Sequence, residues 1–236
     1  MNSALLEVRN IHTYYGDSHI LQGISLEIYR GEVIALLGRH GAGKTTTLLS
    51  IMGIQPPSKG NIFFNNEEIA GLPPWEIARR GIGLVPENRR LFPELTVAEN
   101  LEVGSKASSR GYNLETVYAD FPELLDLRQR QARRLSGGQQ QMLTIARTLM
   151  GNPTMLMMDE PTEGLAPLVV QRIAKIVERL VARGYTLLIT EQNITLALKL
   201  AHRVYILDMG VIKWSGTMAE LRSSPEISGK YLAVSL

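Results

Sequence analysis

The sequence predicts an α/β protein built around a mostly parallel sheet. Continuous apolar runs at residues 33–37 and 155–158 are typical of strands buried on both faces. Between and after these runs, apolar residues recur with helical spacing. Strands that alternate with helices along a chain favour a parallel sheet covered by helices.

Local patterns predict the individual elements. Alternating residues on either side of a Tyr15-Gly16-Asp17 turn predict an N-terminal β subdomain, which we expect to be antiparallel. Two apolar runs around Asp208-Met209-Gly210 predict a hairpin near the C-terminus. The other expected strands are residues 5–9, 25–28, 61–64, 82–85 and 186–189, and the expected core helices are 45–52, 169–183 and 194–201.

The middle of the chain has a different texture. From about Thr96 to Met150 it shows helical periodicity with scattered charge, which predicts a helical subdomain inserted into the core. We therefore expect a single domain over residues 1–236. Its α/β core comprises residues 1–88 and 151–236, and its helical subdomain comprises residues 89–150.

The composition excludes several classes of protein. With 44% apolar and 20% charged residues, the chain has the profile of a soluble globular protein. The net charge of +2 gives no strong electrostatic case for a nucleic-acid partner. Basic doublets at residues 79–80, 89–90 and 133–134 are more simply explained as solvated helix faces. The absence of cysteine excludes a disulfide framework and suits a reducing compartment.

No targeting or spanning segment is expected. The N-terminus lacks a basic start followed by a long apolar stretch, as a signal peptide would have. No apolar run approaches the ~18 residues of a spanning helix. If the protein works at a membrane, another component must hold it there.

The first chemical motif is a glycine-rich loop that follows the buried strand at residues 33–37. It matches G-x-x-x-x-G-K-[ST] and precedes an expected helix, which is the context that gives the pattern meaning. Its backbone N–H groups would point at phosphate oxygens, Lys44 would reach the β- and γ-phosphates, and Thr45 would offer its hydroxyl to Mg²⁺. An ordinary glycine-rich turn would not need this strand and helix. The predicted nucleotide-binding residues are Gly38, Arg39, His40, Gly41, Ala42, Gly43, Lys44, Thr45 and Thr46.

A second motif is the apolar strand at residues 155–158 that ends in two acids. Ligands of open α/β sheets bind at the carboxyl ends of the strands. Asp159 would lie close to the metal, mostly through water, and Glu160 would accept the proton of the attacking water. On its own this pair could be two loop acids, but beside the glycine-rich loop it predicts hydrolysis.

The third motif is Leu135-Ser136-Gly137-Gly138-Gln139, which opens an expected helix at residues 140–150. It again directs backbone N–H groups and a helix N-terminus at an anion. A flexible Ser-Gly-Gly linker is a poor alternative, because strong helix formers follow at once. Since the lysine loop already cradles the phosphates, this second cradle is most useful for a nucleotide on another subunit.

Together, GRHGAGKTT, LSGGQQQ and MLMMDEP resemble the ATP-binding cassette of ABC transporters over essentially the whole chain. The resemblance implies a P-loop NTPase (RecA-like) core and a head-to-tail dimer. Two ATP molecules would be sandwiched between the lysine loop of one subunit and the Ser-Gly-Gly segment of the other. Tyr15 falls where the family stacks an aromatic ring on adenine, with packing in the turn as its alternative role. Residues 164–167 fall where the family's subunits meet.

Two positions depart from the family pattern. Glu87 stands where a glutamine usually contacts Mg²⁺ and senses the membrane subunit, and Gln192 stands where a histidine usually contacts the γ-phosphate. Glutamine can donate a hydrogen bond but carries no proton at neutral pH. We therefore assign Glu160, Gln192 and Lys44 to catalysis, and Thr45, Glu87 and Asp159 to the metal.

The segments VPENRRLFPELTVAENL, EPTEGLAP and TEQN resemble the second of the paired ATPases in branched-chain amino acid importers, whose close relatives serve urea and short amides. This implies ATP and Mg²⁺ as cofactors and a peripheral position at the cytoplasmic face of the inner membrane. It also implies a sister ATPase (or a second copy) as dimer partner, two integral-membrane permease subunits and, indirectly, a substrate-binding protein.

Other ATPase classes fit less well. Chromosome and repair ATPases carry long coiled coils between the two cradles, whereas the segment from Glu87 to Leu135 is short and lacks sustained heptads. Translation factors of this superfamily normally have two cassettes in one chain, and a small-molecule kinase leaves LSGGQ unexplained. The sequence thus predicts a transport ATPase, with an exporter that has separate membrane subunits as the alternative.

Overall fold

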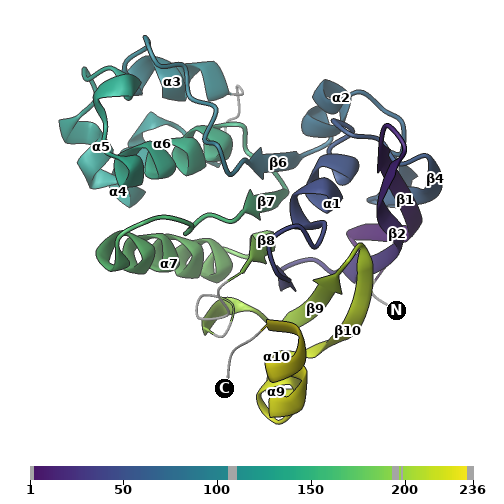
Figure 1. The fold of residues 1–236 in the computed structure, drawn as a ribbon. Coiled ribbons are helices and arrows are strands. Elements are labelled where there is room, and N and C mark those ends of the chain that lie inside the picture. Colours follow the sequence, from purple (N-terminus) through teal and green to yellow (C-terminus); the bar gives the residue numbers. More distant parts are fainter. Residues whose placement is uncertain (1–2, 106–110, 193–196, 198, 233–236) are drawn as a thin grey trace.

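The computed structural model describes residues 3–105, 111–192, 197 and 199–232. Its larger sheet has six strands in the order β10-β9-β3-β8-β7-β6, parallel except for β10 (Figure 1). Its smaller sheet is antiparallel, in the order β2-β1-β4-β5. The predicted fold class is thereby confirmed.

The strands of the larger sheet are β3 (Val33–Leu37), β6 (Ile82–Val85), β7 (Met155–Asp159), β8 (Thr186–Glu191), β9 (Arg203–Asp208) and β10 (Val211–Thr217). Those of the smaller sheet are β1 (Leu6–Tyr15), β2 (Ser18–Ile28), β4 (Lys59–Phe64) and β5 (Glu67–Glu68). Strands β3 and β7 are buried along their whole length, as their continuous apolar runs predict. The expected hairpin joins β9 to β10, and its loop has two residues, Met209 and Gly210, both with positive φ.

The helices of the described chain lie on both faces of the larger sheet. They are α1 (Lys44–Ile51), α2 (Pro74–Arg79), α3 (Val97–Gly104), α4 (Leu114–Asp120), α5 (Pro122–Asp126), the 3₁₀ helix η1 (Ala132–Arg134), α6 (Gly137–Met150), α7 (Pro167–Ala182), α9 (Met218–Arg222) and α10 (Pro225–Leu232). Within the described ranges, no helix combines the length and apolar character needed to cross a bilayer.

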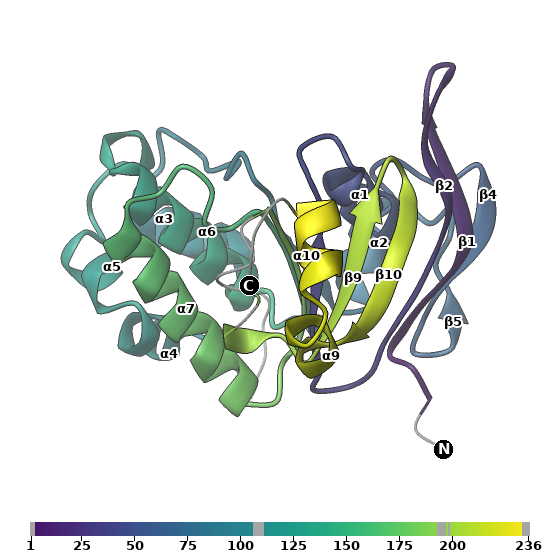
Figure 2. The same ribbon diagram turned by 60° about the horizontal axis from the view of Figure 1, so that its bottom comes forward.

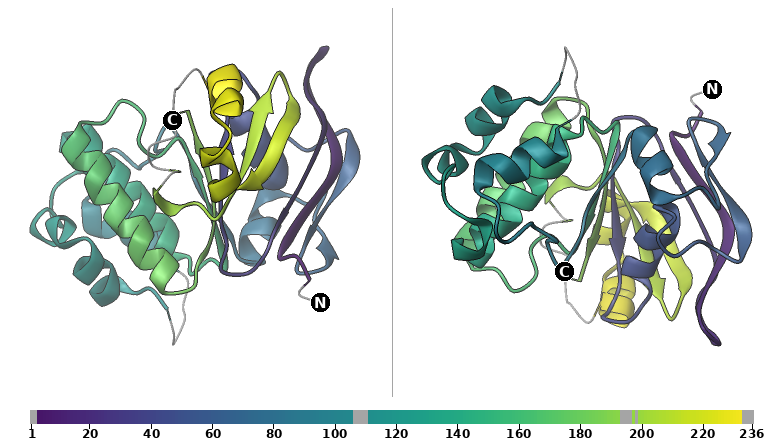
Figure 3. Two further views of the ribbon diagram at one scale, coloured as in Figure 1. Left: turned by 90° about the horizontal axis from the view of Figure 1, so that it is seen from below. Right: turned by 90° about the horizontal axis from the view of Figure 1, so that it is seen from above.

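Two large apolar cores cover the two faces of the larger sheet. One packs the smaller sheet and α1 against it, through side chains such as Ile24, Leu48 and Met157. The other joins α7 to the helices α3 to α6, which we call the helical lobe, through side chains such as Leu143 and Val177. In Figures 2 and 3 the lobe and α7 lie together on one side of the larger sheet, with the smaller sheet on the other. The glycine-rich loop between β3 and α1 belongs to the first of these cores, in which Ala42 is buried.

Polar contacts also fix the helical lobe to α7. Arg183 forms two hydrogen bonds to Asp120, of 2.6 and 3.0 Å, and a third of 2.8 Å to the Tyr112 hydroxyl. Tyr112 donates to Asp120 over 2.6 Å. Because α4 and α7 share this network, we treat the lobe and α7 as one mechanical unit.

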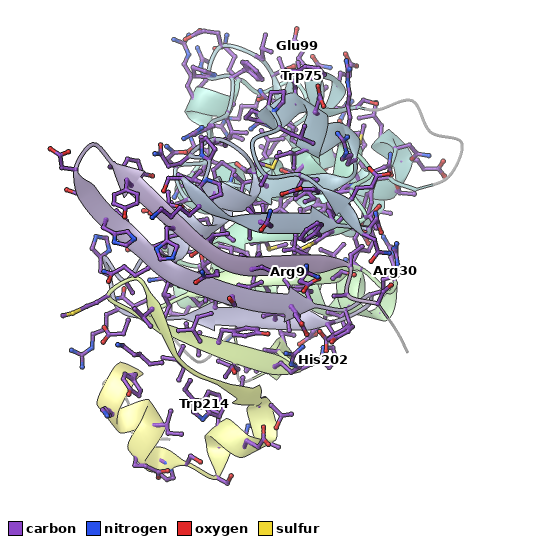
Figure 4. The ribbon with its side chains drawn as sticks, turned by 90° about the vertical axis from the view of Figure 1, so that its right-hand side faces the viewer. Arg9, Arg30, Trp75, Glu99, His202 and Trp214 are labelled. Carbon is purple, nitrogen blue, oxygen red and sulfur yellow. The ribbon has the colours of Figure 1, made fainter. Side chains whose placement is uncertain are left out.

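The outer face of the smaller sheet is solvated and lies away from the site. There the guanidinium of Arg9 lies over the Phe63 ring, 4.6 Å from its centroid (Figure 4). Such a cation–π contact lets a polar side chain cover apolar surface.

The structure differs from the sequence predictions at several boundaries. β1 extends to Tyr15, beyond the strand expected at residues 5–9. The prediction stopped early because bulges after Val8 interrupt the alternation of apolar and polar residues. α6 starts at Gly137 rather than at residue 140, because Ser136 caps it. The short elements β5, α2, α9 and α10 were not predicted. Half of the helix expected at residues 194–201 falls outside the described residues. Of the described half, residues 197, 199 and 200 are helical.

Candidate nucleotide site

The glycine-rich loop joins the end of β3 to the start of α1. Gly43 precedes the helix with φ 109°, a conformation that a side chain would strain. At Gly38 a Cβ would lie 2.4 Å from the carbonyl oxygen of Leu207, so the close approach of β9 requires glycine there. The two constraints hold the loop curled around the first turn of α1.

Lys44 is buried beneath this loop with its ammonium group fully engaged. Its Nζ donates to the carbonyl oxygens of Gly38 and Arg39, over 2.8 and 3.0 Å. It also forms an ion pair with Glu160 Oε1 at 2.9 Å, and both side chains are less than 10% exposed. Charges removed from water in this way are stable only when paired. Any anion that enters the loop must compete with Glu160 for Lys44.

Glu160 follows β7 in a strained conformation. Its φ is 42°, which is uncommon for a residue with a side chain and costs roughly 1–3 kcal/mol. Its backbone N–H donates to Thr190 Oγ1 over 3.0 Å. Strand β8 thus holds the turn that directs the carboxylate toward Lys44.

Asp159 lies beside Thr45 and forms an oxygen-rich corner. Thr190 donates to Asp159 Oδ1 over 2.7 Å, and Thr45 donates to the same oxygen over 3.2 Å. Burial raises the pKa of Asp159, the negative charges of Glu87 and Glu160 add to this effect, and the two hydroxyl hydrogen bonds oppose it. A hydroxyl and carboxylates are the hard oxygen ligands that Mg²⁺ prefers, so this corner fits the predicted metal.

A cavity of 290 Å³ brings half of the predicted residues together. Its lining is Tyr15, Ile20, His40, Gly41, Gly43, Lys44, Thr45, Thr46, Glu87 and Glu160. Tyr15, at the end of β1, is 45% exposed. Its ring is therefore available to a planar ligand. Gly38, Arg39 and Ala42 belong to the same loop, and Asp159 lies behind Thr45.

Residues 136–139 do not line this cavity, because they start α6 in the helical lobe (Figure 1). Ser136 and Gln139 form a reciprocal capping box, with Gln139 Oε1 accepting from the Ser136 N–H over 2.9 Å. A Cβ on Gly138 would lie 2.8 Å from Val169 Cγ2, so glycine allows α6 to meet α7 closely. One subunit therefore presents the two predicted phosphate cradles at separate places.

Gln192 is exposed directly after β8 and does not line the cavity. Its neighbour Glu191 was missed by the sequence analysis. This carboxyl is buried, and its Oε1 accepts from Thr162 Oγ1 over 2.8 Å. Burial raises the pKa of Glu191 to about 7, and the nearby charge of Glu160 adds to the effect. The signal that could have revealed Glu191 is its position as an acid at the end of the apolar strand β8.

The prediction that the basic doublets lie on solvated helix faces is wrong for Arg89 and Arg90. Both lie in the turn after β6, with φ of 60° and 44°. The Arg89 guanidinium donates to Gln140 Oε1 over 3.1 Å, across to α6. Tertiary contact with α6, which a single sequence does not reveal, explains this conformation.

Comparisons with known proteins agree with this geometry. The family model for ABC transporters matches residues 21–163. The chain is 40% identical to the high-affinity branched-chain amino acid transport ATP-binding protein BraG of Pseudomonas aeruginosa, over 97% of this chain and 99% of BraG. It is 34% identical to the lipopolysaccharide export system ATP-binding protein LptB of Escherichia coli, over 97% of each chain.

Solved structures give the same result for the fold. The ATP-binding cassette MJ1267 of an ABC transporter aligns with a TM-score of 0.83 and 29% identity, over 98% of each chain. The dimeric bacterial cassette MJ0796 aligns with a TM-score of 0.77 and 26% identity, over 90% of this chain and 98% of that one. Since the family model covers more than half of the sequence and a relative 40% identical spans nearly all of it, the chain belongs to the ABC transporter family as an ATP-binding subunit, and it is an ATPase.

Proposed function

We propose that this ATPase energises an importer of branched-chain or other neutral, hydrophobic amino acids through separate permease subunits. The observation that carries the solute class is its full-length relatedness to BraG, at 40% identity, compared with 34% for LptB. Relatedness to LivF of Archaeoglobus fulgidus, a probable branched-chain amino acid transport ATP-binding protein, supports the same class at 34% identity.

ATP binds with its phosphates in the glycine-rich loop and its adenine on Tyr15. The loop's N–H groups and the start of α1 attract the phosphates, and Lys44 exchanges its ion pair with Glu160 for the β- and γ-phosphate oxygens. This exchange keeps the buried ammonium neutralised. It also frees the Glu160 carboxylate beside the terminal phosphate.

Glu160 then accepts the proton of the attacking water. Positioned general bases of this kind contribute about 10²–10⁴-fold to a rate. Thr45, Asp159 and Glu87 supply oxygen atoms for Mg²⁺, which when bound neutralises charge on the β- and γ-phosphates. Gln192 donates a neutral hydrogen bond to the γ-phosphate, where a histidine could also carry a proton.

The segment Ser136–Gln139 serves the nucleotide of a second subunit. It lies outside the cavity of its own chain, and its helix start supplies N–H groups to an anion. A head-to-tail dimer, with a sister ATPase or a second copy, then completes two sites. Residues 164–167, which lead from the acids into the start of α7, lie at the subunit contact.

A groove of 450 Å³ between the core and the helical lobe accepts the permease subunits. Its apolar lining includes the exposed side chains Ile54, Phe92 and Val103, and Arg90 and Arg147 add positive charge. An amphipathic helix with apolar and acidic side chains complements this surface. A cytoplasmic helix of a permease meets that description, and binding there holds this subunit at the cytoplasmic face of the inner membrane.

The proposal is tested by reconstituting the subunit with its cognate permeases and binding protein in proteoliposomes. ATP-dependent uptake of radiolabelled leucine, competed by isoleucine and valine, is the expected result. Uptake of urea or short amides without leucine would move the protein to the related importer class. Lipid extraction without any uptake would identify an exporter ATPase, the alternative that the relatedness to LptB favours.

A further inference from the structure

The turn after β6 connects the nucleotide cavity to the start of α6. Glu87 lines the nucleotide cavity together with Lys44 and Glu160. It also lines a second cavity of 420 Å³, which Arg89 and Gln140 share. One short turn therefore reaches both the nucleotide and the start of α6.

Side chains of α6 hold this turn through hydrogen bonds to the backbone carbonyl groups of the turn. Thr144 Oγ1 and Arg147 Nη2 both donate to the Arg89 carbonyl oxygen, over 3.3 Å each. Arg147 also donates to the Arg90 carbonyl over 2.8 Å. Two successive residues with side chains adopt left-handed φ there, a strained arrangement that persists only when its surroundings enforce it.

The Arg89 side chain completes the connection. Its Nη1 donates to Gln140 Oε1 over 3.1 Å, and Gln140 Nε2 donates to the Ala132 carbonyl over 3.2 Å. The guanidinium lies 3.4–3.7 Å from the position that a Cβ on Gly137 would occupy. A movement of the turn must therefore shift the first turn of α6, where the Ser136–Gln139 segment begins.

On the basis of the proposed function, we infer that Arg89 is a positioning residue that couples the subunit's own nucleotide to its Ser136–Gln139 segment. If a nucleotide in the cavity displaces the turn that carries Glu87, Arg89 carries the displacement through Gln140 to the start of α6. Nucleotide at one site thereby orients the cradle that serves the other site. Coupling between sites of this kind is typically 5–150-fold.

The test compares Arg89→Ala, Arg89→Lys and Gln140→Ala with Arg133→Ala as the matched control. Arg133 lines the same cavity but pairs with Glu94 instead of α6. Affinity for a fluorescent ATP analogue is measured on dilute, monomeric protein. ATP-driven dimerisation is measured in the Glu160→Gln background, and the Hill coefficient is measured from ATP turnover.

Arg89→Ala is expected to leave monomer affinity within about twofold, to weaken ATP-driven dimerisation about tenfold and to bring the Hill coefficient to about 1. Gln140→Ala is expected to change the same two quantities in the same direction, and it tests the contact if Arg89→Ala folds poorly. Arg89→Lys is expected to retain part of the coupling. Arg133→Ala is expected to show neither the weaker dimerisation nor the lower Hill coefficient.

Parental dimerisation and Hill coefficient in both Arg89→Ala and Gln140→Ala would overturn the coupling role. An equal loss of monomer affinity in Arg89→Ala would instead give Arg89 a role in its own site and overturn the inference too. Failure of the Glu160→Gln parent to dimerise with ATP, both alone and with the sister ATPase, would contradict the proposed two-subunit site, which is a separate result.

Discussion

At the scale of single residues, the site is governed by buried charges with defined partners. Lys44 and Glu160 neutralise each other, and Asp159 accepts two hydroxyl hydrogen bonds. In the proposed function, phosphate oxygens take the place of Glu160 at Lys44, so the buried ammonium stays neutralised and the Glu160 carboxylate is released from its ion pair. The proposed function therefore depends on an exchange of partners at Lys44.

Glu191 gives a pH-dependent prediction at this scale. Its pKa is raised to about 7, from about 4.5 when exposed, because it is buried. The folded state therefore holds a proton that the unfolded state has lost. The free energy of unfolding should fall between about pH 4.5 and 7 by about 3 kcal/mol from this group.

Glu191→Gln removes this dependence while its amide oxygen still accepts from Thr162. Relative to the parent, the variant should gain little stability at pH 5 and about 3 kcal/mol at pH 8.5. Urea unfolding at both pH values measures the difference. A gain that is the same at both values would show that Glu191 titrates normally.

At the scale of elements, the meeting of α6 with α7 decides where the second cradle points. Both helices belong to the core that includes the helical lobe, and Val169 of α7 lies against Gly138 of α6. Since α7 begins at the last of residues 164–167, the proposed subunit contact and the second cradle are held to the same helix pair. The packing of α6 against α7 therefore determines where the second cradle lies relative to residues 164–167.

Gly138→Ala should disturb this packing. Its Cβ would lie 2.8–2.9 Å from both Val169 methyl carbons, and overpacking of this kind costs about 1–3 kcal/mol. Gly137→Ala is the control, because its Cβ would make ordinary contact with Arg89 at 3.4 Å. Thermal or urea unfolding measures both variants.

A second change at Val169 tests the cause. In the Gly138→Ala background, Val169→Ala should restore most of the lost stability by removing the clashing methyl groups. A double variant that is less stable than Gly138→Ala would mean that the loss has another origin, such as altered capping at Ser136.

Elements that carry strong local signals were predictable from the sequence, and contacts between distant elements were not. The apolar runs gave β3 and β7, and the glycine-rich loop identified itself through its spacing. Thr217 and Glu220 form a capping box that could have revealed α9. The bond from Arg89 to Gln140 depends on how β6 and α6 pack, which a single sequence does not encode locally.

The candidate site shows the same division. The positions around Lys44 could be predicted, because their spacing encodes their chemistry. The ion pair between Lys44 and Glu160 and the buried state of Glu191 could not, because both depend on the order of strands in the sheet. Whether Gln192 reaches the γ-phosphate stays a prediction.

At the scale of the whole molecule, the helical lobe and the core enclose a surface suited to another protein. The groove between them exposes Phe92, whose ring stacks on the Arg147 guanidinium at 5.5 Å. The groove lies next to the turn that carries Glu87 and Arg89, because Pro86 and Arg90 line it. A permease helix bound there would contact the same turn that contacts the nucleotide cavity.

Phe92→Ala should therefore weaken assembly with the permeases more than it affects the isolated ATPase. Central aromatic contacts typically contribute about 2 kcal/mol or more to an interface, roughly thirtyfold in affinity. Co-purification with the permeases measures assembly, and phosphate release measures turnover. Leu125→Ala, an exposed apolar position on α5 outside the groove, is the control.

Equal assembly of the Phe92→Ala and parent proteins would place the permease elsewhere on the surface. A loss of turnover in the isolated Phe92→Ala protein would show that the side chain serves the fold of the lobe instead. Either result would remove the groove from the proposed function.

The central claim is that one subunit holds half of each site, and the Glu160→Gln variant tests it most directly. Sedimentation of this variant with ATP and Mg²⁺, alone and mixed with the sister ATPase, should show a stable dimer in at least one of the two samples, with turnover lowered about 10²–10⁴-fold. Lys44→Ala should stay monomeric, since it lacks the cation that holds the phosphates. A Glu160→Gln protein that stays monomeric with ATP bound both alone and with the sister ATPase, or that turns over at the parental rate, would contradict the account.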